Sequence, residues 1–114
     1  MTIVGPGHDP VAICAEVATT EAERMEGLRG REALEPGEGL LLRSPVAGQV
    51  CVVNRGVSFD IDVAYAAPDG TVVALERAVP AGDPTLRCHD AVIDVLETAS
   101  AELTAVEVGD VLSP

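Results

Sequence analysis

The chain has 114 residues, of which 47% are hydrophobic, but its only aromatic residues are Phe59 and Tyr65. This length is typical of a single domain, and a core assembled from Val, Leu, Ile and Ala favours strands. The net charge of −12 comes from 19 acidic residues against seven arginines, and it argues against nucleic acids and anionic membranes as partners.

The first ten residues carry no recognisable targeting signal. They have neither the basic start nor the apolar segment of a secretory leader. No apolar run in the chain reaches the roughly 18 to 20 residues that are needed to span a bilayer. We therefore expect a cytoplasmic protein, with residues 1–10 as an N-terminal tail and residues 11–114 as one globular domain.

The start of the domain predicts a strand followed by a helix. Residues 11–17 alternate apolar and polar side chains as a half-buried strand does. Thr20 and Glu23 have the spacing of a capping box, in which each side chain binds the other residue's backbone N–H, so a helix should begin there. We expect it to run for about ten residues, because Gly30 can supply the left-handed stop.

The middle of the chain predicts short strands separated by turns. A turn at residues 36–39 leads into an apolar strand at residues 40–42, which Ser44-Pro45 should end. Residues 49–54 and 59–65 are two further strands, and the short link between them predicts that they are neighbours.

The second half of the chain begins with a strong turn signal. Pro68-Asp69-Gly70 should join the strand at residues 59–65 to residues 71–77 in an antiparallel hairpin. Two prolines and a glycine make residues 78–87 a surface loop. The remaining expected elements are a strand at residues 91–97, a helical turn at residues 100–105 and a short strand at residues 106–112.

Several short motifs occur in an order that is known from one protein family. They are Ala15-Glu16-Val17-Ala18-Thr19, Gly39-Leu40-Leu41, Val50-Cys51-Val52-Val53-Asn54-Arg55, Ser58-Phe59-Asp60, Val95-Leu96-Glu97 and Gly109-Asp110. Through this order, over roughly residues 11 to 112, the chain resembles the bacterial and archaeal family catalogued as domain of unknown function 192.

The resemblance implies a fold and supplies no activity. The fold is α+β and mostly β, with a small antiparallel barrel-like sheet and one packed helix. The family's hallmark strand reads Phe-Trp-Met-Lys-Asn-Thr and is followed by Pro-Leu-Asp, so only Asn54 and Asp60 match it unchanged. Val50, Cys51 and Val53 stand where the family has its aromatic pair and its lysine. This loss of bulk would open a dry cavity suited to an apolar ligand.

Asn54, Arg55, Asp60 and Asp62 are the candidate catalytic residues. The aspartates lie two apart on an expected strand, so their side chains should leave one face about 6 to 7 Å apart. With the amide and the guanidinium nearby, they would form a polar cluster able to hold a carbonyl or an enolate. The alternative is that the aspartates face solvent and that Arg55 is an ordinary ion-pair partner, worth about 0 to 1 kcal/mol.

Other chemistry has less support in the sequence. Cys14, Cys51 and Cys88 are odd in number and far apart, which is typical of reduced thiols that behave as small buried hydrophobic residues. A cysteine nucleophile would have to pair Cys51 with His89. Without paired ligand spacing we expect no metal site, and Gly5-Pro6-Gly7 does not precede the kind of turn that binds a nucleotide phosphate.

Together these observations favour a cofactor-independent enzyme. It would bind a small, largely apolar metabolite in a barrel pocket and promote cyclisation, isomerisation or rearrangement, as in the biosynthesis of specialised metabolites. The ligand would contact Val50, Cys51, Val53 and Glu97. The alternative is a non-catalytic accessory module that binds a small ligand or a protein. Glu97 also recurs in the family pattern with Glu16 and Arg24, as an ion-pair network between helix and sheet or as part of a cleft.

Overall fold

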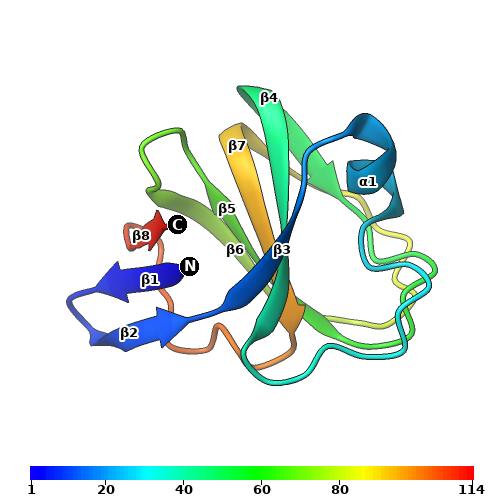
Figure 1. The fold of residues 1–114 in the computed structure, drawn as a ribbon, viewed down its shortest axis with the longest axis horizontal. Coiled ribbons are helices and arrows are strands. Elements are labelled where there is room, and N and C mark those ends of the chain that lie inside the picture. Colours follow the sequence, from blue (N-terminus) through cyan, green and yellow to red (C-terminus); the bar gives the residue numbers. More distant parts are fainter.

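The computed structural model describes residues 1–114 and contains eight strands and one short helix (Figure 1). The strands are β1 (Thr2–Gly5), β2 (His8–Ala12), β3 (Cys14–Ala18), β4 (Glu38–Val52), β5 (Ile61–Ala66), β6 (Val72–Val79), β7 (Arg87–Ala99) and β8 (Val111–Ser113). The helix α1 (Glu21–Glu26) lies between β3 and β4. The expected α+β, mostly β fold is confirmed, but the strands form two separate sheets and no closed barrel.

A five-stranded sheet in the order β3-β4-β7-β5-β6 forms the centre of the molecule. β3 runs parallel to β4, and the other neighbouring pairs are antiparallel. Since β7 lies between β4 and β5, the expectation that residues 49–54 and 59–65 are neighbours is wrong. β7 is 13 residues long and pairs with both strands, and this long-range pairing outweighs the short link between them.

β4 passes through a proline. We expected Ser44-Pro45 to end the strand, but β4 extends over 15 residues to Val52. Its register against β7 shifts between Arg43 and Gly48, so the ladder is interrupted where Pro45 has no N–H to donate. Beyond this bulge, the outer end of β4 (residues 48–52) pairs with β7 alone.

Residues 1–10 were expected to be a tail, but they contain β1 and most of β2. β1 pairs antiparallel with both β2 and β8 in a three-stranded sheet. The single strand expected at residues 11–17 is divided at Ile13, where the chain leaves this sheet and enters the central one. The last strand is shorter than expected, because Gly109, with φ of 100°, turns the chain just before β8.

α1 begins where its capping box predicts. Thr20 is the N-cap, its hydroxyl accepts from the Glu23 N–H, and the Glu23 carboxylate accepts from the Thr20 N–H. The helix has six residues instead of about ten, because it ends at Gly27, with φ of 53°, and not at Gly30. With this single short helix, the chain has no helical segment that could cross a membrane.

The hairpin predicted from Pro68-Asp69-Gly70 is confirmed. β5 and β6 pair antiparallel, and Gly70 adopts a φ of 89°, which glycine tolerates without strain. Residues 80–86 form the expected loop between β6 and β7, and successive turns occupy residues 100–105.

The central sheet lies between α1 on one side and the three-stranded sheet on the other (Figure 1). A hydrophobic core fills each side. The helix-side core lies beneath α1 and the chain that follows it, and includes Leu28 and Tyr65. The hairpin-side core, named after the hairpin of β1 and β2, lies between the opposite face of the central sheet and the three-stranded sheet. It includes Ile3 and Leu96. Each face of the central sheet is therefore covered.

Candidate functional site

Two adjoining hollows lie between α1 and the outer end of β4. The larger, here called the outer cleft, has a volume of about 410 Å³, and the smaller, the inner pocket, has about 80 Å³. The residues that line both are Arg24, Arg29, Leu42, Cys51 and Val53. Because they share these walls, the hollows form one site, called the cleft below. Neither here nor elsewhere do three or more His, Cys, Asp or Glu side chains gather in a metal-binding arrangement.

Glu97 is the buried ionisable group of the inner pocket. It is 4% exposed, and its Oε1 atom has no hydrogen-bond partner. Burial raises the pKa of its carboxyl group from the ordinary 4.5 to about 7. The group is therefore near the midpoint of its titration at neutral pH, where it can both accept and donate a proton.

The central sheet holds Glu97 in place. The residue lies within β7, opposite Leu40 of β4 on one side and Val63 of β5 on the other. The backbone after α1 approaches its carboxylate at Gly27, where an added Cβ would lie 3.8 Å from Oε1. The left-handed φ of Gly27 favours glycine at this position, whereas the distance of 3.8 Å would leave room for a Cβ.

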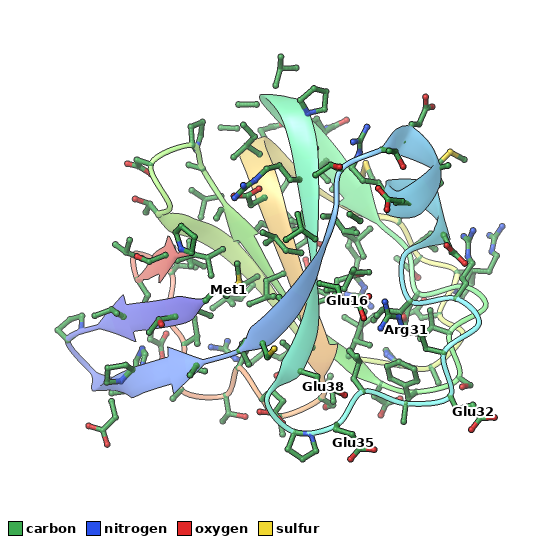
Figure 2. All side chains as sticks on the ribbon, viewed as in Figure 1. Met1, Glu16, Arg31, Glu32, Glu35 and Glu38 are labelled. Atoms are coloured by element: carbon green, nitrogen blue, oxygen red, sulfur yellow. A yellow bond between two sulfur atoms is a disulfide. The ribbon has the colours of Figure 1, made fainter.

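The ion-pair network expected for Glu16, Arg24 and Glu97 does not form. Glu16 pairs with Arg31, with Oε2 and Nη2 2.6 Å apart, and the two side chains lie together in Figure 2. Arg24 donates to backbone carbonyl groups instead. Arg24 and Glu97 both line the inner pocket, so the cleft alternative describes these two residues.

Cys51 and Cys88 form a disulfide bond across β4 and β7. They are direct partners in the ladder, with Cα atoms 4.0 Å apart. The expectation of reduced thiols is wrong for this pair, because a separation of 37 residues gave no hint that the two strands are adjacent. Cys14 is the free thiol, and it is exposed. The bond removes Cys51 as a nucleophile, and His89 binds Glu76 instead, with Nε2 and Oε2 2.7 Å apart.

The two predicted catalytic aspartates serve the backbone and do not face each other. Asp62 is 1% exposed and accepts the N–H groups of Ala78 and Leu103 at 2.9 and 3.0 Å. Asp60 precedes β5, is exposed, and accepts the Ala81 N–H at 2.8 Å. The Asp62 side of β5 was expected to be open, but the turns at residues 100–105 cover it.

Asn54 and Arg55 also lie outside the walls of the cleft. Asn54 is buried, and its Nδ2 donates to the carbonyls of Phe59 and Pro80 at 3.1 and 2.9 Å. It thereby ties the segment after β4 to the loop after β6. Arg55 is exposed, and its carbonyl accepts from Arg29 Nε. The structure does not bring the four predicted catalytic residues into one cluster.

The four residues predicted to contact a ligand, by contrast, all line the cleft. Val50 lines the outer cleft, Glu97 lines the inner pocket, and Cys51 and Val53 line both. They come from β4, from β7 and from the segment just after β4, so the pairing of β4 with β7 brings them together.

Apart from Arg24, which was considered as part of a cleft, the helix side of the cleft was not predicted. Arg24 and Met25 of α1, and Arg29 just after it, line the outer cleft. The available signal was a pair of arginines, with Arg24 inside α1 and Arg29 just after it. Met25 is 67% exposed, because α1 ends at Gly27, too early to complete an apolar face.

The family model of DUF192, described as Uncharacterized ACR, matches residues 2–114. The chain belongs to the DUF192 family. Two solved structures share its fold with a TM-score of 0.94 each. A protein of unknown function from Novosphingobium aromaticivorans is 21% identical over 99% of this chain and 82% of its own, and a protein from Sinorhizobium meliloti, provisionally named a transcription regulator, is 20% identical over 98% and 89%. None of the curated proteins matches the sequence.

In this DUF192 protein, the altered hallmark strand forms a wall of the cleft. Val50, Cys51 and Val53 stand in place of the family's two aromatic residues and its lysine, and all three line the outer cleft. Aliphatic side chains and a cysteine fill less space than rings. The open volume therefore lies where the family motif would place bulk.

Proposed function

We propose that this DUF192 protein is a cofactor-independent enzyme that binds a small, largely apolar metabolite in the cleft and moves a proton on it, in a cyclisation, isomerisation or rearrangement. The observation that carries the proposal is Glu97, a buried carboxyl group with an unpartnered oxygen at the inner end of the cleft. Burying such a group costs stability unless it is compensated, so its presence points to chemistry.

Glu97 would act as both base and acid. In its ionised form it takes a proton from a carbon next to a carbonyl group, and the electron pair moves onto the carbonyl oxygen to form an enolate. Where a carbon–carbon double bond is conjugated with this enolate, the neutral carboxyl returns the proton to the far carbon of the conjugated system and the double bond moves. The proton is conserved and no electrons are exchanged, so the reaction needs no cofactor. A pKa of about 7 suits a group that must work in both directions at neutral pH.

The walls of the cleft support such a reaction. Leu42, Val50 and Val53 present apolar surface, which displaces water from the ligand and strengthens electrostatic interactions within the site. A volume of about 410 Å³ lies toward the small end of ligand sites, which span roughly 300 to 1,000 Å³. This proposal assigns proton transfer to Glu97 in place of the four residues singled out from the sequence.

Solvent deuterium exchange tests the proposal. A panel of small enolisable apolar ketones, aldehydes and acids is incubated with the protein in D₂O and followed by proton NMR. We expect at least one member to exchange a C–H proton, and the rate to fall at least about 100-fold in Glu97→Gln, the usual scale for a general base.

Asp60→Asn is the matched control for this experiment. It also neutralises one carboxylate, but Asp60 is exposed and lies outside the cleft, so exchange should continue at the parent rate. Exchange that persists in Glu97→Gln, or that is lost in Asp60→Asn, would contradict the assignment of Glu97.

The second candidate is a non-catalytic accessory module that binds a small ligand or a protein. It is favoured by one observation, namely that Glu97 is the only buried ionisable group lining the inner pocket, so no second buried acid or base assists it. Ligands that bind in the NMR experiment without exchanging any proton would identify this module.

We propose small molecules, and not nucleic acids, as partners. The charge of −12 repels phosphate, and this argument applies whatever the provisional name of the Sinorhizobium meliloti protein. We also propose the cytoplasmic location expected from the sequence. The disulfide opposes the location, because cytosolic thiols are kept reduced. The oxidation state of Cys51 and Cys88 in cells therefore tests the proposed location.

A further inference from the structure

The cleft contains two arginines that have no carboxylate partner. The chain has 19 acidic residues and seven arginines, so carboxylates outnumber arginines. Arg31, Arg43 and Arg87 do form ion pairs. The other four arginines, Arg24, Arg29, Arg55 and Arg77, form none. Of these four, only Arg24 and Arg29 line the outer cleft and the inner pocket.

Backbone carbonyl groups hold both guanidinium groups in position. Arg24 donates from Nη1 to two carbonyls. Arg29 donates from Nε to Arg55 O at 3.1 Å and from Nη1 to Met25 O at 3.3 Å. Neither side chain uses Nη2, so each keeps N–H donors for a ligand. Positioning a guanidinium before binding reduces the conformational entropy that is lost when the ligand binds.

The acidic residues around the cleft leave this positive charge available. Glu21 lines the outer cleft and Glu26 lines the inner pocket, but both are exposed and neither pairs with an arginine. Glu97 faces the inner pocket, where burial favours its neutral form. The cleft of a strongly acidic protein therefore presents two free cationic groups beside apolar walls.

We infer that the cleft binds a small organic acid with one carboxylate and an apolar body. Arg24 and Arg29 hold the carboxylate, because planar guanidinium donors match its two oxygens, and the apolar body lies along Val50 and Val53. The charge of −12 disfavours a ligand with several negative charges. The placement of the ligand's reacting end at Glu97 rests on the proposed function, whereas the binding of the carboxylate by the arginines does not depend on it.

Octanoate and octanamide are matched probes for this inference, since they differ in charge and hardly in size. Each is titrated into isotope-labelled protein at low salt and followed by two-dimensional NMR. We expect octanoate to bind at least about tenfold more tightly than octanamide, the scale of charge-assisted hydrogen bonds. Failure of octanoate to bind, or equal affinity for the two probes, would overturn the inference.

Three variants test which arginines cause the preference for octanoate. Arg24→Gln and Arg29→Gln should each weaken octanoate binding about tenfold and leave octanamide binding unchanged. Arg55→Gln is the control, because Arg55 is exposed, lies outside the cleft and keeps the carbonyl that Arg29 binds. An equal loss in Arg55→Gln would show that the attraction is not specific to the cleft, and would also overturn the inference.

Glu97→Gln separates this inference from the proposed function. The variant should keep its affinity for octanoate while deuterium exchange on the substrate is lost. Intact octanoate binding with no exchange in the parent contradicts only the proposed function. Intact exchange with no preference for octanoate over octanamide contradicts only the inference about the ligand.

Discussion

At the scale of single residues, Glu97 couples the stability of the fold to pH. Its carboxyl group ionises near pH 4.5 in the unfolded chain and near pH 7 in the folded protein. Between these values the folded state keeps a proton that the unfolded state releases. The free energy of unfolding therefore falls as pH rises from about 4.5 to 7, by about 3 kcal/mol, and the contribution is constant above that range.

We predict that Glu97→Gln removes this dependence. Relative to the parent, the variant should gain about 3 kcal/mol in free energy of unfolding between pH 4.5 and pH 8, measured by urea unfolding at both values. His8, whose pKa is raised by its hydrogen bond to Asp110, also contributes to the pH dependence, but it is present in both proteins. Its contribution cancels in the comparison, and a difference that does not change with pH would contradict the prediction.

Asp62 is a structural carboxylate, and its removal should destabilise the fold. In Asp62→Ala the buried N–H groups of Ala78 and Leu103 lose their acceptor, which should cost about 2 to 5 kcal/mol in urea unfolding. Asp60→Ala is the comparison, since the carboxylate it removes is exposed, and its cost should stay below about 1 kcal/mol. Similar losses in the two variants would reject this distinction.

These residues show how far the sequence predicts a site. The cleft contacts of Val50, Cys51, Val53 and Glu97 follow from loss of bulk in a strand motif and from a recurring glutamate. The burial of Asp62 does not follow from its strand, because it depends on turns nearly forty residues away. A carboxylate on an alternating strand gives the same local pattern whether solvent, a pocket or another segment covers it.

At the scale of elements, the outer parts of β4 and β7 form a two-stranded ribbon. Between residues 87 and 92, β7 pairs only with β4, and the Cys51–Cys88 disulfide links the two strands there. We predict that Cys51→Ser combined with Cys88→Ser lowers the free energy of unfolding by about 2 to 4 kcal/mol. In urea unfolding, dithiothreitol should lower the free energy of unfolding of the parent to that of the variant. The free energy of unfolding of the variant should not change. A parent insensitive to dithiothreitol would contradict the prediction.

The same cysteines report on the compartment. Thiols are alkylated in rapidly quenched cells and counted by mass. Three reactive cysteines would mean that the pair is reduced, as a cytoplasmic location requires, whereas Cys14 alone would indicate an oxidising compartment.

Elements with local signals were predicted well, and those fixed by distant partners were not. The N-terminus of α1 and the β5–β6 hairpin follow from residues within four positions of each other. The place of β7 between β4 and β5, and the path of β4 through Pro45, depend on pairing between segments tens of residues apart. The disulfide was missed for the same reason.

At the scale of the whole molecule, part of the negative charge lies away from the cleft. Glu32 and Glu35, on the segment between α1 and β4, and Glu38, at the start of β4, are outside the walls of the cleft (Figure 2). The family resemblance predicted the fold class correctly. The barrel was wrong because β1, β2 and β8 form their own sheet, which covers one face of the central sheet instead of closing it.

The two hydrophobic cores lie on opposite faces of the central sheet, and only the helix-side core adjoins the cleft. The hairpin-side core, with Ile3 and Leu96, contributes no side chain to the cleft. Residues of α1 and the outer end of β4 can therefore be exchanged without disturbing that packing. For protein engineering, the fold is therefore a scaffold in which a library confined to a few cleft positions can be selected for a new ligand preference. The core on the other face of the central sheet would continue to stabilise the fold.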